Sequence, residues 1–361
     1  MQQEKTGYMS HSRQGESGKK MDHKERFFAT VNREKVDRPA SWLGLPAYEA
    51  EKGLLEYFVV KDIAGLKRKL NDDIYPVNVP YDNPPSNHIA CAFDFAVKGG
   101  SSDYGKRTLT APGFFMEMSD PASVEEFNWP DPAACMSVAI CRQAIEKAPA
   151  DAAVLGIMWA AHFQDACAAF GMETALVKMI SEPELFNAVI DRIIDFYLKA
   201  GDIFYQAGKG KLDAVLIGND FGSQTGLMIS PELLRRFVFP GTKKLISQAK
   251  SYGLKVIHHS CGSIVDVIDD LINIGTDVIH PIQALASGME PRNLKALFGD
   301  RVSFCGGVDA QNLLVRGTPS EVRAKVRELK SVFPTGCIIS PSHEAVLADI
   351  PPANIEAIFD D

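Results

Sequence analysis

Residues 254–283 read LKVIHHSCGSIVDVIDDLINIGTDVIHPIQ. Two short apolar, β-branched runs, 254–259 and 276–280, flank the stretch 263–273, in which apolar residues recur with helical spacing. A buried strand, a crossover helix and a second buried strand form the repeating unit of a parallel sheet. This stretch therefore predicts an α/β fold, and it places His259, Ser260 and Cys261 at the carboxyl end of a strand.

The same unit recurs along the chain. Further strands are expected at 40–45, 74–79, 153–159, 213–218, 302–305 and 337–341. Proline and acidic residues mark helix starts at Ser181-Glu182-Pro183-Glu184, Ser230-Pro231-Glu232 and Thr318-Pro319-Ser320-Glu321. Eight nearly continuous apolar strands separated by helices are typical of a closed (β/α)8 TIM-type barrel.

One domain accounts for most of the chain. Residues 1–22 are polar and are expected to be a disordered leader, and residues 23–361 form the barrel domain. Between 80 and 130, alternation and turn residues predict an inserted hairpin near the barrel mouth. No internal repeat or second domain boundary is visible.

Composition restricts the partners. The chain has 38 basic and 46 acidic residues, a formal net charge of -8, which offers no electrostatic footprint for nucleic acid or an anionic membrane. A small molecule or a protein is the expected partner. Without a membrane-length apolar run or a signal sequence, we expect a cytoplasmic protein, and its seven scattered cysteines are expected to be reduced thiols.

Polar side chains follow six successive predicted strands. In a barrel of this type catalytic groups sit at the carboxyl ends of the strands. The candidate catalytic residues are Asp220, His162 and His280, and the candidate substrate contacts are Gln224, Asn219, Gln283 and Trp42. A histidine at a strand end can equally bond a loop carbonyl, and an aspartate there can accept loop N–H groups.

His259 and Cys261 are the candidate metal ligands. Imidazole and thiolate are preferred by zinc, and catalytic zinc sites use three protein ligands. The third ligand must come from another strand end, where His343 is favoured and Cys305 or an acidic residue is the alternative. Cys337 begins its strand and should lie roughly 13 Å below the rim by strand rise, so it is set aside.

Several longer segments carry a family resemblance. They include ERFFATVNREKVDRPA at 25–40, DFGSQTGLMISPELLRRFVFP at 220–240 and PSHEAVLADIPPANIEAIF at 341–359. From about residue 24 to 360 the chain resembles the uroporphyrinogen decarboxylase superfamily. The resemblance implies a (β/α)8 barrel and one of two chemistries: cofactor-free decarboxylation of a tetrapyrrole, or zinc-dependent methyl transfer to or from corrinoid proteins.

Two segments distinguish these branches. The decarboxylases carry an arginine-rich segment after strand one, whereas residues 42–50 here read WLGLPAYEA and contain no arginine. The methyltransferases carry His-x-Cys-Gly after strand five, to which His259-Ser260-Cys261-Gly262 is similar, and a cysteine after strand eight, where this chain has His343.

The resemblance therefore implies a zinc-dependent methyltransferase that acts on a small methylated compound or a corrinoid protein. Its corrinoid would be carried by a partner protein, and a homodimer is expected. Two alternatives remain open. One is a metal-independent decarboxylase or lyase that uses Asp220 and His343 as an acid–base pair. The other is a non-catalytic tetrapyrrole or corrinoid binder.

Overall fold

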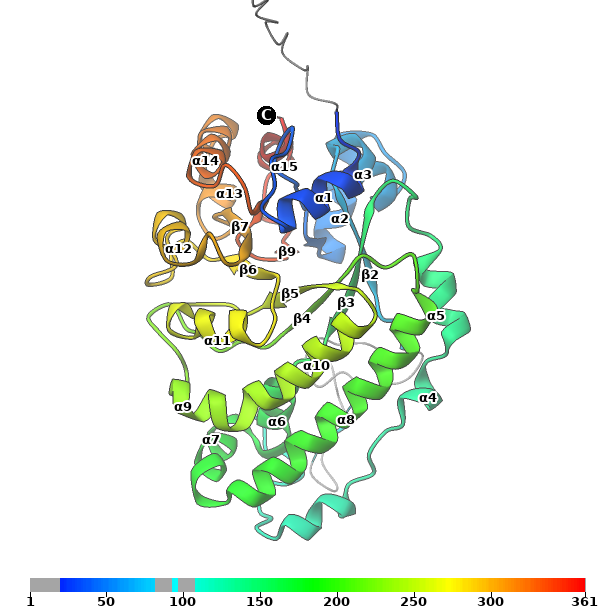
Figure 1. Ribbon diagram of the computed structural model, residues 1–361, viewed down its shortest axis with the longest axis vertical. Coiled ribbons are helices and arrows are strands. Elements are labelled where there is room, and N and C mark those ends of the chain that lie inside the picture. The colour runs from blue at the N-terminus through cyan, green and yellow to red at the C-terminus, as the bar shows by residue number, and fades with distance from the viewer. Residues whose placement is uncertain (1–19, 82–92, 97–107, 361) are drawn as a thin grey trace, which may run out of the picture.

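A computed structural model describes residues 20–81, 93–96 and 108–360 of the chain. Seven parallel strands form one curled sheet in the order β2-β3-β4-β5-β6-β7-β8, surrounded by helices (Figure 1). The strands are β2 (Ile74–Asn78), β3 (Ala153–Trp159), β4 (Ala214–Gly218), β5 (Lys255–His259), β6 (Val278–Ile282), β7 (Ser303–Val308) and β8 (Cys337–Pro341). The predicted α/β fold of the TIM-barrel type is confirmed.

The first predicted strand, 40–45, is much shorter than expected. The Ile339 N–H donates to the Ala40 carbonyl (2.8 Å), and the Trp42 N–H donates to the Ile339 carbonyl (3.0 Å). On the other side, the Asp73 N–H donates to the Ser41 carbonyl (3.2 Å), so residues 40–42 bridge β8 to the start of β2. The chain then turns at Gly44 and forms β1 (Leu45–Pro46), which pairs with β9 (Ala345–Val346).

The helices occupy the connections between strands. They are α1 (His23–Val31), α2 (Tyr48–Phe58), α3 (Ile63–Leu70), α4 (Pro132–Cys135), α5 (Val138–Ile145), α6 (His162–Phe170), α7 (Met172–Ser181), α8 (Pro183–Ala207), α9 (Pro231–Leu233), α10 (Phe239–Ser251), α11 (Ile268–Asn273), α12 (Pro291–Phe298), α13 (Leu313–Arg316), α14 (Pro319–Val332) and α15 (Pro352–Phe359). The 3-10 turns Pro121–Glu126 and Val265–Val267 and the π-helical turn Leu234–Val238 complete the set. Figure 1 shows α8 and α10 running together along one flank, where they contact each other.

Two of the three predicted helix starts have the expected caps. Ser230 caps α9, and Thr318 forms a reciprocal capping box with Glu321 at α14. The third differs, because Ser181 is the last residue of α7 and Glu182 takes the cap position of α8. The helix expected from 263 begins only at 265, as a 3-10 turn before α11.

Side chains of each strand alternate between the barrel interior and the surrounding helices. On β5, Ile257 packs inside the barrel with residues of β2, β3, β4, β6, β7 and β8, whereas Val256 packs outward against the helical layer. Helix α1 closes the amino-terminal end of the barrel, since it contacts β2, β3, β7 and β8 and places Phe27 in the interior core. His259 is therefore the last inward-facing residue of its strand.

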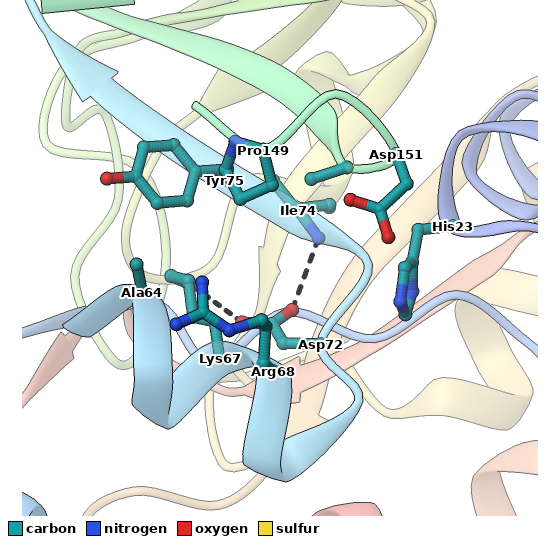
Figure 2. A pocket seen from close by; sticks show the side chains of 10 residues that line it. His23, Ala64, Lys67, Arg68, Asp72, Ile74, Tyr75, Pro149 and Asp151 are labelled. Atoms are coloured by element: carbon teal, nitrogen blue, oxygen red, sulfur yellow. Dashed lines mark hydrogen bonds and ion pairs between the residues drawn. The ribbon is translucent and has the colours of Figure 1, made fainter. Parts of the chain in front are cut away.

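A buried ion-pair network supports the closed end. Asp73, which is fully buried, accepts hydrogen bonds from Arg26 (2.6 Å) and Arg38 (2.6 Å). Nearby, Lys67 donates to Asp72 (2.6 Å) beside a cavity of about 20 Å³, as Figure 2 shows. A cavity of this size holds about one water molecule.

The predicted hairpin at 80–130 lies partly outside the described residues. Within them, Ala96 and Gly113 form an antiparallel bridge, and the Phe114 N–H donates to the Phe95 carbonyl (2.9 Å). Phe115 is fully buried in a cluster of aromatic rings that includes Trp129. The described part of this segment is therefore an aromatic packing layer.

The amino-terminal boundary also differs from the prediction. Residues 1–19 of the expected leader lie outside the described residues, and Asp22 already belongs to the fold as the cap of α1. None of the described helices is long and apolar enough to cross a membrane.

Candidate metal centre

His259 stands at the centre of a polar cluster at the carboxyl end of β5. Its neighbour on β4 is Gly218, where an added Cβ would lie 2.5 Å from the Cβ of His259. Only glycine at 218 lets β4 pass this close. The imidazole is nearly buried, and its two nitrogens face two different sets of side chains.

The Nε2 side of His259 faces a sulfur and a carboxylate. Cys261 Sγ lies 3.5 Å from Nε2, and Asp220 Oδ1 lies 3.2 Å from it. The three donor atoms are all within 4.8 Å of one another. A thiolate and an imidazole on one tetrahedral zinc ion, at about 2.3 and 2.0 Å, stand roughly 3.5 Å apart. The chemistry and the spacing of this donor set fit zinc.

Hydrogen bonds tie the loops that carry these donors together. Asp220 Oδ1 accepts from the Cys261 N–H (2.8 Å), and Ser260 Oγ accepts from the Phe221 N–H (3.0 Å). From β6, the side-chain oxygen of Gln283 accepts from the Gly262 N–H. The loops after β4, β5 and β6 therefore form one unit, and Gln283 acts within it as a support for the backbone.

The Nδ1 side of His259 faces a different pair. His280 Nδ1 lies 2.9 Å from it, within hydrogen-bond distance, and Glu344 Oε2 lies 3.5 Å from it. His259 and His280 are direct neighbours across β5 and β6. Glu344 follows β8, so the cluster joins strands from half of the barrel.

His343 borders the sulfur of Cys261. Its Nδ1 accepts from the Ala345 N–H (3.0 Å), and the ring makes a hydrogen bond with the Cys261 side chain. His343 is 39% exposed at its side chain, and it lies at the solvent edge of the cluster.

Neighbouring charges control protonation here. Burial lowers the pKa of His259, but Glu344, Asp220 and Cys261 outweigh burial and raise that pKa well above its ordinary value. Burial raises the pKa of the Cys261 thiol, whereas hydrogen bonds with His259 and His343 lower it by more, so the net shift is downward. Without metal, the pair favours imidazolium and thiolate.

Asp220 stays ionised for a similar reason. Burial would raise the pKa of this carboxyl, but the hydrogen bond with His259 and the Cys261 N–H hold it well below its usual range. Its side chain is 43% exposed, so the Nε2 side of the cluster opens toward solvent.

Two predicted site residues, His162 and Asn219, lie together but away from this cluster. The His162 ring contacts the carbonyls of Ala160 (3.0 Å) and Val238 (3.1 Å), and the Asn219 amide nitrogen lies 3.3 Å from its Nδ1. Asn219 Oδ1 also accepts from the Phe163 N–H (2.7 Å). The hydrogen bonds of these two side chains connect the end of β4 with the start of α6.

Of three other predicted site residues, Trp42 borders the cluster, whereas Cys305 lies in the middle of β7 and not at its end, and Gln224 is exposed. Trp42 is fully buried inside the barrel, with its ring 5.2 Å from that of His280. Cys305 is also fully buried in the interior core, where burial raises its thiol pKa well above the ordinary value. Gln224 is exposed on the loop after β4, and its backbone carbonyl accepts from the Ser287 N–H (2.9 Å).

Glu344 and Trp159 were not predicted as site residues. Glu344 follows His343 directly after β8, so its place at a strand end was the available signal. The Trp159 ring stands edge-on to His259 at 5.3 Å. Trp159 and Ala160 both have left-handed backbone angles (φ 57° and 53°), a conformation that costs L-residues about 1 kcal/mol or more each.

Comparisons with known proteins agree with the fold and with the family resemblance. A methylated-thiol–coenzyme M methyltransferase of Methanosarcina mazei is 27% identical over 158 residues, which cover 44% of this chain and 40% of that relative. The solved structure of a methyltransferase from Methanosarcina mazei superposes with a TM-score of 0.66 at 17% identity, covering 94% of this chain and 97% of that one. The family model for uroporphyrinogen decarboxylase (URO-D) matches residues 101–361. The chain belongs to the uroporphyrinogen decarboxylase (URO-D) family.

Proposed function

We propose that the protein is a zinc-dependent methyltransferase that takes a methyl group from a small methylated compound or exchanges it with a corrinoid protein. The observation that carries the proposal is the convergence of His259 Nε2, Cys261 Sγ and Asp220 Oδ1 within 4.8 Å at the end of β4 and β5. His259 and Cys261 would hold the ion, and Asp220 would be the third ligand in place of His343 or Cys305.

Zinc at this position would act as a Lewis acid, stabilising a substrate thiolate at neutral pH or polarising the atom that bears the methyl group. The protein's own residues prepare the site. Asp220 and the Cys261 thiolate supply negative charge for a cation, and the exposed side of Asp220 leaves room for a substrate. His343 would hydrogen-bond the Cys261 sulfur and limit its basicity.

The name of one relative favours a methyl group attached to sulfur. One of them is named for a methylated thiol and coenzyme M, a thiol, so both its methyl donor and its acceptor carry sulfur. Because the aligned stretch covers 40% of that relative, the substrate remains part of the proposal. The corrinoid would be bound by a separate protein that docks at the barrel mouth.

Metal content and methyl transfer test the proposal together. Purified protein should hold about one zinc per chain. With methylcobalamin and 2-mercaptoethanesulfonate, methyl transfer should break the cobalt–carbon bond and form a thioether and cob(I)alamin, followed by absorbance. Cys261→Ala should lose zinc and transfer, whereas Cys337→Ala, which removes a buried thiol at the start of β8, should retain both.

Other outcomes identify the alternatives. Metal-free protein that releases carbon dioxide from uroporphyrinogen would indicate a decarboxylase, with Asp220 and His343 as its acid–base pair. That activity needs partners for the substrate carboxylates, and residues 42–50 contain no arginine. A spectral shift of cobalamin without turnover would indicate a corrinoid-binding protein.

A further inference from the structure

We propose that Glu344 and His280 are positioning residues that hold a proton on Nδ1 of His259 and aim its Nε2 at the metal. The inference rests on the proposed function, since it concerns the same ion. It assigns roles to two side chains that touch His259 from the side opposite Cys261 and Asp220.

The first step is to decide which side of His259 faces a metal. Two nitrogens bound to one tetrahedral zinc ion at about 2.0–2.1 Å stand roughly 3.3 Å apart. His259 Nδ1 and His280 Nδ1 are 2.9 Å apart, a hydrogen-bond distance. The His259–His280 pair is therefore joined by a proton, whereas the 3.5 Å between His259 Nε2 and Cys261 Sγ suits two ligands of one ion.

The second step is to decide which ring carries the shared proton. Glu344 Oε2 lies 3.5 Å from His259 Nδ1, so its negative charge favours an N–H on His259. His280 Nδ1 then accepts, and the proton of the neutral His280 ring resides on Nε2, which is buried with no hydrogen-bond partner among the described residues. A metal-bound histidine commonly donates its other N–H in this way, which fixes the ring and its tautomer.

The third step concerns the place of Glu344. The Leu45 N–H donates to the Glu344 carbonyl (2.6 Å), and β1 runs beside β9 from there. Gly44 has φ +88°, and a Cβ on it would lie 2.4 Å from the same carbonyl. The segment 40–46, which closes the barrel, therefore also holds Glu344 beside His259.

This arrangement gives His280, a candidate catalytic residue at the end of its strand, the role of a positioning residue. Its Nδ1 is engaged by His259, and its ring packs on Trp42 in the interior. His280 acts on the metal through His259, as an acceptor that holds the ring in place.

Cobalt titration of the metal-free protein tests these roles, because the thiolate-to-cobalt and d–d absorption bands report affinity and geometry without a substrate. Glu344→Gln removes the charge, and His280→Leu removes the acceptor. Each should weaken cobalt binding about 10- to 100-fold. His280→Asn, which offers an oxygen near the Nδ1 position, should restore most of the affinity. Asp349→Asn removes an exposed carboxylate from the connection that follows β9 and should bind like wild type.

A second readout follows the proton itself. Nitrogen-15 spectra of the zinc-loaded protein should show His259 protonated on Nδ1 in wild type and His280→Asn. Wild-type cobalt affinity in both Glu344→Gln and folded His280→Leu would overturn the inference. If His280→Leu does not fold, Glu344→Gln with wild-type affinity overturns the role of Glu344, and a His259 signal protonated on Nε2 overturns both roles. Wild-type protein that binds no cobalt would instead refute the metal site of the proposed function.

Discussion

Replacing His258 should reduce the acid sensitivity of the fold. His258 faces outward from β5, is fully buried, stacks on Phe221 at 5.8 Å, and has no hydrogen-bond partner for either ring nitrogen among the described residues. Burial lowers its pKa to about 3. The unfolded chain, in contrast, binds a proton at His258 as the pH falls through about 6.5.

The size of the effect follows from these two pKa values. Between about pH 6.5 and 3 the unfolded state binds a proton that the folded state excludes, so stability falls as the pH falls through this window. At pH 5 the unfolded-state pKa lies about 1.5 units above the pH, and His258 destabilises the fold by about 2 kcal/mol relative to pH 8. Phenylalanine keeps the ring stack and does not titrate.

Urea unfolding at pH 8 and pH 5, with a chelator present so that metal release does not contribute, measures the difference. His258→Phe should lose about 2 kcal/mol less stability than wild type between the two pH values. His258→Asn, polar but without a titrating ring, should show the same reduced pH dependence at lower absolute stability. Variants that lose as much stability as wild type would refute the assignment of a buried, neutral His258.

Three further predictions concern the metal centre and the closed end of the barrel. Gly44→Ala should destabilise the fold by about 1–3 kcal/mol in urea unfolding and weaken cobalt binding. The control Gly53→Ala on α2, where a Cβ meets nothing within 4 Å, should leave the stability unchanged or increase it. Zinc binding near neutral pH should release about one proton from His259, because the pKa of this imidazole is raised in the metal-free protein. Calorimetry in buffers of different ionisation enthalpy measures the released proton. A binding heat that does not depend on the buffer would contradict the prediction. Asp73→Ala should cost about 3–5 kcal/mol, because it removes the buried carboxylate that Arg26 and Arg38 share and leaves Arg26 only its partly exposed partner Asp37. A folded variant should still bind cobalt with wild-type affinity, and unchanged stability in urea would contradict the prediction.

The barrel strands were predictable because their residues are apolar on both faces. Seven of the eight predicted strands correspond to β2 through β8. The exception, 40–45, is apolar enough for a strand, but Gly44 turns the chain toward Glu344 after three bridging residues. Sequence shows that such a segment is buried, and it does not show where pairing stops.

The candidate site was only partly predictable, because a place at a strand end tells where a residue lies along the barrel but not which way its side chain points. His258 and His259 are adjacent, yet the first faces the helices and the second faces the barrel mouth. His162 also follows a strand, and its ring turns toward Val238 on the helical side. The contact between His259 and Glu344 joins separate strands, and its geometry depends on packing that no local pattern encodes.

The segment 40–46 has a consequence for the order of events during synthesis. It pairs with residues that are synthesised much later: Ser41 with Ile339, and Leu45 with Ala345. Until those residues leave the ribosome, the barrel cannot close and Glu344 cannot lie beside His259. A nascent chain whose residues 337–346 have not yet emerged would therefore display Cys261 without Glu344 beside His259, and tight metal capture should begin only after these residues leave the ribosome.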